Sequence, residues 1–421
     1  MSSLAQILHD AGFSVQGSDV DHYYFTQKPL EEKGIPFFSF DEKNITSDLM
    51  IIYSNAYNDS HPEIKKAKEL GLDVLAYHDF LGYFANQYKS IGVSGAHGKT
   101  STTALLAHVL KGIHPTSYLI GDGTGEGVPE STYFAFESCE YRRHFLSYKP
   151  DYSIITNIDF DHPDYFKDED DVVSAFESFS NQTTKRVIAY GDDQNVRKLT
   201  SSTILYYGFG SENELRAEHV RVEENHMLFD VYYQGKFVDT FERNVFGEHH
   251  VLNALSVIAV CLIENISLQQ AKERMKTFGG AKRRFSEKTC GTNILVDDYA
   301  HHPTEIKATI QSARLKYPTR PIVAVFQPHT FTRTEKFLHE FAASLSAADS
   351  VYLCDIFASA REQAGSLTIH DMIALIEKAE HISEDSISKL LVHEDSILLF
   401  MGAGDIQKMQ QAYEKNFNVT C

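Results

Sequence analysis

A glycine-rich segment near residue 95 contains the residue types that hold the phosphates of a nucleotide. Residues 94–101 read Ser-Gly-Ala-His-Gly-Lys-Thr-Ser and follow a short apolar run. Glycines allow backbone N–H groups to face an anion, Lys99 can reach the outer phosphates, and the Thr100 hydroxyl can ligate Mg²⁺. Val93 stands where the longer form of this motif has its first glycine, so the match is to G-x-x-G-K-T. The loop predicts nucleotide binding and leaves the reaction open; it consists of Gly95, Ala96, His97, Gly98, Lys99, Thr100 and Ser101.

Acidic and histidine residues follow two further predicted strands. Residues 133–136 end in Glu137, and residues 153–156 end in the segment 157–162, Asn-Ile-Asp-Phe-Asp-His. Carboxylates and imidazole suit Mg²⁺ or Mn²⁺ on a triphosphate, where phosphate and water supply most of the oxygen ligands. Alternatively, the two aspartates of the second segment only turn the chain and its histidine lies on the surface. The residue types alone leave both interpretations open.

A second group of polar side chains occurs in the last third of the chain. Residues 297–305 read Asp-Asp-Tyr-Ala-His-His-Pro-Thr-Glu, and residues 327–333 read Gln-Pro-His-Thr-Phe-Thr-Arg. Each segment follows a predicted strand, and the guanidinium of Arg333 offers a fork for a carboxylate or a phosphate. Helix capping and ring packing are the simpler explanation for His302 and Phe331. We therefore predict an anion-binding site at the ends of these two strands.

The elements that position these segments alternate between helix and strand along the whole chain. The alternation predicts an α/β protein of three domains, with boundaries at residues 1–88, 89–286 and 287–421. In the last domain the predicted strands are 294–296, 322–326, 351–354 and 397–400, and the predicted helices are 305–316 and 334–346. Such a pattern is typical of a parallel sheet covered by helices, and ligands bind at the carboxyl ends of its strands.

The composition excludes several classes of partner. The 421 residues include 39 Lys or Arg and 58 Asp or Glu, and the net charge is −19. Nucleic acid and anionic membrane surfaces both require a basic excess, so we predict neither as a partner. The longest nearly apolar run, residues 251–263, is shorter than the roughly 20 residues that cross a bilayer. We expect a cytoplasmic protein with ordinary thiols at Cys139, Cys261, Cys290, Cys354 and Cys421.

Taken together, these motifs resemble the Mur ligases, and within that family the branch that adds L-alanine. The resemblance covers essentially the whole chain. Its segments are the phosphate loop, Phe-Glu-Ser-Cys-Glu at 136–140, residues 157–162, Lys-Arg-Arg-Phe at 282–285, residues 297–303 and Phe-Gln-Pro-His at 326–329. The phosphate loop is shared with folylpolyglutamate synthetases, whereas the last two segments are specific to the alanine-adding branch.

The resemblance implies a fold and a reaction. The fold is a Rossmann-like domain for the UDP substrate, a P-loop ATPase-type domain and a Rossmann-like domain for the amino acid. The reaction joins L-alanine to the muramate carboxylate of UDP-N-acetylmuramate through an acyl phosphate, with ATP and Mg²⁺ or Mn²⁺, in a monomer or weak homodimer. The alternatives are a related ligase that adds another amino acid or a peptide, a folylpolyglutamate-synthetase-like ligase, and an ATP-binding protein without ligase activity.

The resemblance also implies roles for individual residues. Lys99 clamps phosphate, Thr100 and Glu137 hold the ATP-bound Mg²⁺, and His162 holds a second metal ion. The remaining roles go to His301 and Tyr299 beside the γ-phosphate and acyl centre, His329 and Arg333 on alanine, Asn253 beside adenine, and Ser18 and Asp19 on the uridine nucleotide. His250 occupies a position where the family usually has Asn.

The front of the chain departs from the family pattern. The family begins with a strand and a glycine-rich turn for the uridine diphosphate, followed by residues similar to Met1-Ser2-Ser3-Leu4, with which this sequence begins. We therefore expect an incomplete first domain with two unpaired strand edges, weak binding of the UDP-sugar and a tendency to associate.

Overall fold

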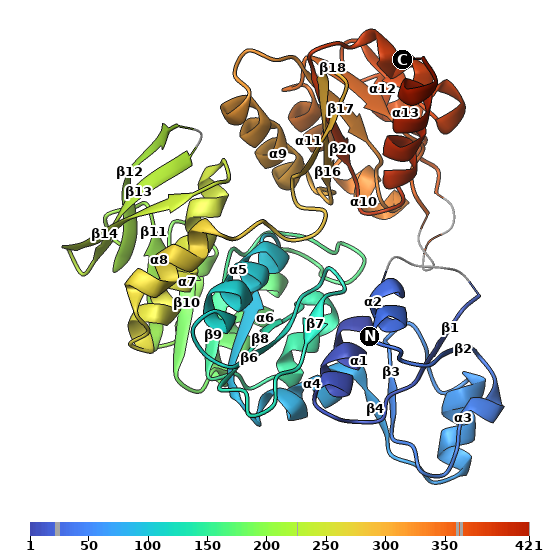
Figure 1. Cartoon of the computed structure of the whole chain (residues 1–421), viewed down its shortest axis with the longest axis vertical. Coiled ribbons are helices and arrows are strands. Elements are labelled where there is room, and N and C mark those ends of the chain that lie inside the picture. Colours follow the sequence, from blue (N-terminus) through green and yellow to red (C-terminus); the bar gives the residue numbers. More distant parts are fainter. Residues whose placement is uncertain (22–25, 225, 359–361, 363–364, 421) are drawn as a thin grey trace.

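Three α/β units make up the fold in a computed structural model of the chain. It describes residues 1–21, 26–224, 226–358, 362 and 365–420, so Cys421 lies outside the described residues. Figure 1 shows the C-terminal unit above the central unit and the N-terminal unit at the lower right. The predicted α/β fold of three units is therefore confirmed.

The N-terminal unit contains two small parallel sheets, each of two strands. Strand β1 pairs with β2, and β3 pairs with β4. Its elements are α1 (Ser2–Asp10), β1 (Gly17–Asp19), α2 (Lys28–Glu32), β2 (Phe37–Ser39), β3 (Ile51–Tyr53), α3 (Pro62–Glu69), β4 (Val74–Ala76) and α4 (Tyr77–Ala85). Leu4 and Ile7 of α1 are buried in the same apolar cluster as Phe134 of the central sheet. This packing attaches the N-terminal unit to the central one.

A ten-stranded sheet forms the centre of the molecule, in the order β14-β13-β12-β11-β10-β9-β5-β8-β6-β7. Its strands are β5 (Lys89–Ser94), β6 (Thr116–Leu119), β7 (Gly125–Glu126), β8 (Tyr133–Glu137), β9 (Tyr152–Ile155), β10 (Arg186–Tyr190), β11 (Ile204–Gly208), β12 (Leu215–Glu223), β13 (His226–Tyr233) and β14 (Lys236–Arg243). The pairings from β6 through β8, β5, β9, β10 and β11 to β12 are all parallel. At the two ends of the sheet, β7 is antiparallel to β6, and β13 and β14 form an antiparallel extension beside β12.

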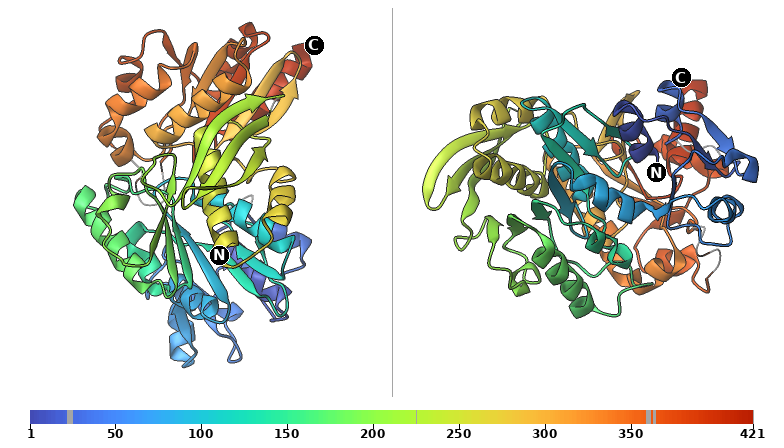
Figure 2. Two further views of the ribbon diagram at one scale, coloured as in Figure 1. Left: turned by 90° about the vertical axis from the view of Figure 1, so that its left-hand side faces the viewer. Right: turned by 90° about the horizontal axis from the view of Figure 1, so that it is seen from below.

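Helices cover both faces of this central sheet, as Figure 2 shows. They are α5 (Lys99–Lys111), α6 (Glu169–Gln182), α7 (Glu248–Ile263) and α8 (Leu268–Lys276). Ile91 and Val93 of β5 pack with α5 and α7, whereas Phe134 and Phe136 of β8 pack with α6 on the opposite face. Because each face is buried in its own core, the strand ends that carry the predicted site are held rigidly.

The C-terminal unit has a six-stranded sheet in the order β15-β16-β20-β17-β18-β19. Its strands are β15 (Ser286–Cys290), β16 (Asn293–Asp298), β17 (Ile322–Phe326), β18 (Ser350–Leu353), β19 (Ala379–His381) and β20 (Ile397–Met401). Only β15 is antiparallel to its neighbour, so the predicted parallel sheet is confirmed for the other strands.

The helices of this unit are α9 (Pro303–Lys316), α10 (Phe331–Lys336), α11 (Leu338–Leu345), α12 (Ile369–Ile373) and α13 (Gln407–Thr420). The single helix predicted over 334–346 is thus two helices. Phe337 separates them because its backbone, at φ −112° and ψ 24°, leaves the helical region. Its ring packs edge-on against His302, with the ring centres 4.9 Å apart.

The structure also shows the state of the cysteines and the lengths of the helices. Cys139, Cys261, Cys290 and Cys354 are free thiols. Among the described residues, no helix is both long enough and apolar enough to cross a membrane.

Candidate functional site

The phosphate loop connects β5 to α5, as the sequence predicts. Gly95 and Gly98 both have positive φ angles, 141° and 82°. A Cβ atom at Gly95 would lie 2.0 Å from the Thr156 hydroxyl, so a side chain at this position would collide with the neighbouring strand end. The loop therefore needs glycine, and it leads directly into the N-terminus of α5, where unpaired backbone N–H groups favour an anion.

Lys99 is held by a carboxylate that sequence analysis left without a role. Its Nζ atom lies 3.0 Å from Glu140, and it also donates to the backbone oxygens of Gly95 and Ala96. Burial by itself would lower the pKa of Lys99, but the charge and hydrogen bond of Glu140, together with Cys139 and Glu137, outweigh burial and raise this pKa above its usual range. The ammonium group therefore stays charged beside the loop. The signal for Glu140 was its place in the Phe-Glu-Ser-Cys-Glu segment.

Thr100 and Glu137, both predicted metal ligands, lie together. The Thr100 hydroxyl hydrogen-bonds to the Glu137 carboxylate, which also accepts a hydrogen bond of 2.7 Å from the Gly121 N–H. Burial raises the pKa of Glu137, and these hydrogen bonds and the charge of Lys99 oppose it. A hydroxyl and a carboxylate beside a glycine loop are oxygen ligands of the kind that Mg²⁺ prefers, so these residues fit the implied metal.

His162, the predicted ligand of a second metal ion, lies near the same carboxylate that holds Lys99. Its Nε2 atom is 3.6 Å from Glu140 Oε1, and its backbone is left-handed at φ 58°. Its neighbour Asp161 has Oδ2 3.8 Å from the same Nε2 atom, and its Oδ1 accepts two hydrogen bonds from Arg333, at 2.8 and 3.2 Å. Burial opposes the charge on Asp161, but His162 and Arg333 outweigh it and hold the Asp161 pKa far below its usual range.

Another cluster joins the phosphate loop to the C-terminal unit. The His97 ring lies 3.0 Å from Asp159 Oδ2 and 3.5 Å from Glu305 Oε1, and its centre is 4.5 Å from that of His302. His97, Asp159 and His302 offer ligand atoms within 4.8 Å of one another, so they form a second group that can hold a metal ion. Burial disfavours the charged His97 ring, but its hydrogen bonds to the two carboxylates raise its pKa to about 9. At neutral pH the protonated ring bridges both carboxylates, and it would have to lose its proton to bind a metal ion.

We expect this contact between the central and C-terminal units to be strongest near pH 6.5. The His97 pKa is raised from 6.5 to about 9, so its stabilisation is full below pH 6.5 and is lost as pH rises through 9. Burial lowers the pKa of His302 from 6.5 to about 4, so its contribution has the opposite sign and is lost as pH falls through 4. The measurement is the protection of backbone amides in the first turn of α9 from hydrogen exchange at each pH, with α11 as an internal reference. Equal protection at pH 6.5 and 9 would contradict it.

The remaining predicted residues of the C-terminal unit form an aromatic cluster. Tyr299 lies under Arg284, with the guanidinium 5.2 Å from the ring centre, and its ring contacts His301 edge-on at 5.2 Å. The His301 ring centre is 6.4 Å from that of His329. Arg284 in turn reaches Thr100 Oγ1 at 3.5 Å. The structure thus brings Tyr299, His301 and His329 together and connects them to the phosphate loop.

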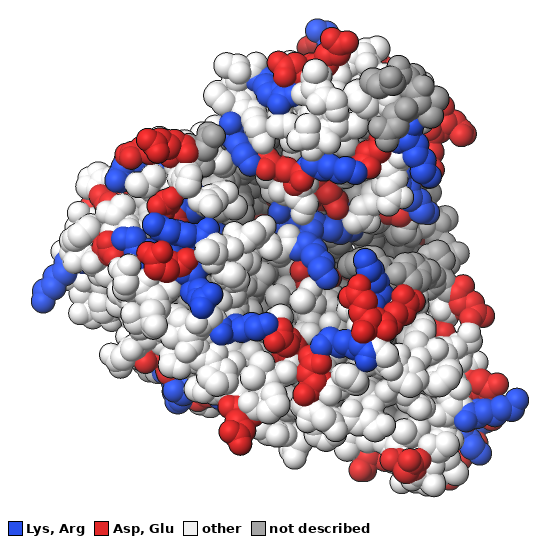
Figure 3. All heavy atoms as spheres, viewed as in Figure 1, with Lys and Arg blue, Asp and Glu red and all other residues white. Residues whose placement is uncertain are grey.

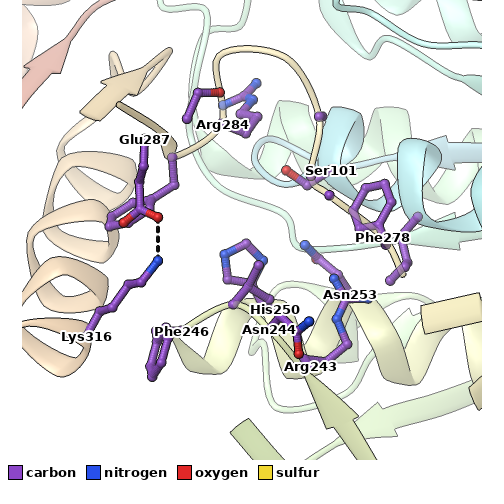
Figure 4. A pocket seen from close by; sticks show the side chains of 17 residues that line it. Ser101, Arg243, Asn244, Phe246, His250, Asn253, Phe278, Arg284, Glu287 and Lys316 are labelled. Atoms are coloured by element: carbon purple, nitrogen blue, oxygen red, sulfur yellow. Dashed lines mark hydrogen bonds and ion pairs between the residues drawn. The ribbon is translucent and has the colours of Figure 1, made fainter. Parts of the chain in front are cut away.

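A pocket of about 380 Å³ adjoins the loop beside α5, and Figure 4 shows its walls. Ser101 and Asn253, both predicted to bind the nucleotide, line it together with His250. Burial is the main cause that lowers the pKa of His250 well below its usual value, so its ring is neutral. The structure therefore places the predicted adenine residue beside a cavity next to the predicted phosphate site.

Ser18 and Asp19 lie apart from these clusters, on β1 of the N-terminal unit. Ser18 donates a hydrogen bond of 2.5 Å to Glu63, and Asp19 accepts one of 3.3 Å from Tyr57. Although the net charge is −19, Figure 3 shows basic side chains in the hollow between the C-terminal unit and the units below it. Such a local basic surface suits anionic substrates.

Sequence models of one family match all three units. "Mur ligase family, catalytic domain" matches residues 1–89, "Mur ligase middle domain" residues 93–261, and "Mur ligase, glutamate ligase domain" residues 283–404. The chain belongs to the Mur ligase family. It is therefore an ATP-dependent amide ligase of peptidoglycan synthesis that acts on small-molecule substrates.

Solved structures of Mur ligases are similar over 89% to 100% of this chain. A UDP-N-acetylmuramate-alanine ligase, MurC, from Thermotoga maritima is 26% identical, with 100% of this chain and 97% of that chain covered and a TM-score of 0.85. A murein peptide ligase from Psychrobacter arcticus is 22% identical, with coverage of 99% and 96% and a TM-score of 0.72. A MurF ligase from Thermotoga maritima in complex with ADP is 15% identical, with coverage of 89% and 97% and a TM-score of 0.69. The last two show a shared fold.

Proposed function

We propose that this chain joins L-alanine to the muramate carboxylate of UDP-N-acetylmuramate. The observation that carries the proposal is the buried pair between Asp161 and Arg333. This pair joins the segment after β9, which contains the proposed metal ligand His162, to the segment after β17. We assign binding of the amino acid to that second segment. The similarity to a MurC enzyme over the whole chain supports the same assignment.

In this proposal the central unit holds ATP and the metal. Lys99 and the N-terminus of α5 hold the phosphates, Thr100 and Glu137 hold Mg²⁺, and His162 holds a second metal ion near Glu140. Bound Mg²⁺ neutralises phosphate charge, so that an anionic carboxylate can approach the triphosphate. Ser18 and Asp19 are proposed to contact the uridine nucleotide, and the domain boundaries given above stay predictions.

The reaction has two steps. An oxygen of the muramate carboxylate attacks the γ-phosphorus of ATP, the bond to the β-phosphate oxygen breaks, and ADP leaves. The alanine amine then attacks the acyl carbon, loses a proton and expels inorganic phosphate. Lys99 and Arg284 stabilise charge on the transferred phosphoryl group, and Tyr299 and His301 face the acyl centre.

The amino acid is proposed to bind between His329 and Arg333. Nε and Nη2 of Arg333 already donate to Asp161, but a guanidinium has further N–H donors with which it can meet a carboxylate. The Arg333–Asp161 pair therefore orients the guanidinium while the free donors bind alanine.

We expect ADP release by the purified chain to require both UDP-N-acetylmuramate and L-alanine. We expect kcat/KM to be roughly tenfold to a few hundredfold lower with glycine and with L-serine than with L-alanine. Glycine lacks the methyl group that would fill the amino-acid site, and L-serine adds a hydroxyl to it. The measurement is a coupled ADP assay over a panel of single amino acids and peptides. Equal activity with L-glutamate, D-glutamate or a tripeptide would contradict the proposed specificity and favour another ligase of the family.

A further inference from the structure

Arg243, the last residue of β14, is a buried cation that has no ion-pair partner among the described residues. It lines the pocket, and only 2% of its surface is exposed. Its Nε and Nη1 atoms are buried without a hydrogen-bond acceptor among the described residues. Its guanidinium lies 5.3 Å from the ring centre of Phe278. Burial lowers the pKa of Arg243 to about 10, so the group is still charged at neutral pH.

The other buried arginines of the described residues are paired. Arg333 binds Asp161 at 2.8 Å, and Arg283 binds the Gly402 carbonyl at 2.8 Å and lies 3.4 Å from Asp297. A buried charge without a partner is destabilising, and a hydrophobic residue of similar size is often better tolerated at such a position. Arg243 is thus the exception, and a ligand in the pocket could supply the acceptor that the protein does not.

The position of the pocket indicates which part of a nucleotide would lie there. Ser101 and Leu105 contribute from the flank of α5, beyond the turn whose N–H groups face the phosphate loop. Phosphates belong at the N-terminus of the helix, so the space along its flank is available to the nucleoside. Phe278, Phe246 and Leu105 contribute apolar lining, which suits a flat aromatic base.

The polar residues that line the pocket limit which atoms of a base Arg243 can contact. Figure 4 shows Arg243 near His250 and Asn253, with Phe278 to one side. Arg243 can only donate hydrogen bonds, whereas the neutral His250 ring and the Asn253 amide can also accept them. The exocyclic amino group of adenine is a donor and cannot pair with Arg243. The available acceptors of the base are its ring nitrogens N1, N3 and N7.

We propose that Arg243 donates a hydrogen bond to a ring nitrogen of the adenine base. This inference rests on the proposed nucleotide site but is independent of the choice of L-alanine. A charge-assisted hydrogen bond in a buried site corresponds to roughly a tenfold to hundredfold difference in affinity.

The test measures binding of ATP and of its 1-deaza, 3-deaza and 7-deaza analogues to the full chain by calorimetry. One analogue should bind the unmodified chain at least about tenfold more weakly than ATP. Arg243→Met should bind ATP and that analogue equally, because the donor is gone. Arg216→Met is the matched control, since Arg216 lies on β12 of the same sheet and pairs with Glu218 at 2.6 Å. This control should keep the discrimination.

Thermal unfolding without nucleotide separates this role from a purely structural one. The midpoint of Arg243→Met should be unchanged or higher, because an unpaired buried charge has been removed. A lowered midpoint would indicate that Arg243 supports the fold instead, and Arg243→Leu provides a second apolar variant should the first misfold. Equal binding of all analogues by the unmodified chain, or discrimination that survives both variants, would overturn the proposal. Loss of ligase activity with intact discrimination would contradict only the proposed function.

Discussion

Replacing Lys99 by methionine is expected to lower the rate of ADP release by about a hundredfold to a thousandfold. Lys99 is the partly buried cation beside the phosphate loop, and methionine keeps its length without its charge. Negative charge that develops on the transferred phosphoryl group would then lose a preorganised partner. The measurement is ADP release with saturating ATP, UDP-N-acetylmuramate and L-alanine.

Lys111→Met is the matched control for this variant. Lys111 lies at the other end of α5, is half-exposed and pairs with Glu126 at 2.6 Å. Exposed ion pairs contribute little to stability, so both activity and unfolding midpoint should stay near those of the unmodified chain. Activity of Lys99→Met within tenfold of the unmodified chain would show that Lys99 does not act on the phosphates.

Replacing Arg333 by alanine is expected to raise the L-alanine concentration required for half-maximal activity about tenfold to a hundredfold. The reason is loss of the proposed contact to the alanine carboxylate. The same change leaves Asp161 buried without its partner, and breaking a buried pair costs about 3–5 kcal/mol. We therefore expect a lower unfolding midpoint in addition to the changed alanine requirement.

Asp161→Asn separates these two consequences. Combined with Arg333→Ala, it removes the unpaired charge, so the double variant should regain thermal stability while the high alanine requirement remains. Trapping of the acyl phosphate without alanine should succeed in the double variant. Arg314→Ala serves as the control, because Arg314 is an exposed residue of α9 paired with Asp349 at 3.0 Å. Loss of the acyl phosphate with an unchanged alanine requirement would contradict the assigned role of Arg333.

The phosphate loop could be predicted because its geometry is local. Strand, loop and helix follow one another within residues 89–111, and the positive φ angles at Gly95 and Gly98 require glycine in the sequence itself. The parallel strands of the C-terminal unit were also predictable, since their apolar runs are short and each ends in polar residues. Strands β12–β14 were missed, although residues 227–231 of β13 alternate between buried and half-buried positions.

The sequence by itself determined the family, the alternation of helix and strand, and the candidate residues at the strand ends, because motifs and periodicity are properties of neighbouring residues. Only the tertiary structure decided which of these residues meet. Lys99 pairs with Glu140 41 residues away, and Arg333 pairs with Asp161 172 residues away. Such partners depend on how whole sheets and units pack against one another. The sequence likewise shows Arg243 only as a charged residue. Its burial beside the pocket, with no hydrogen-bond acceptor for Nε and Nη1 in the part of the chain that the structure describes, is a property of the assembled fold.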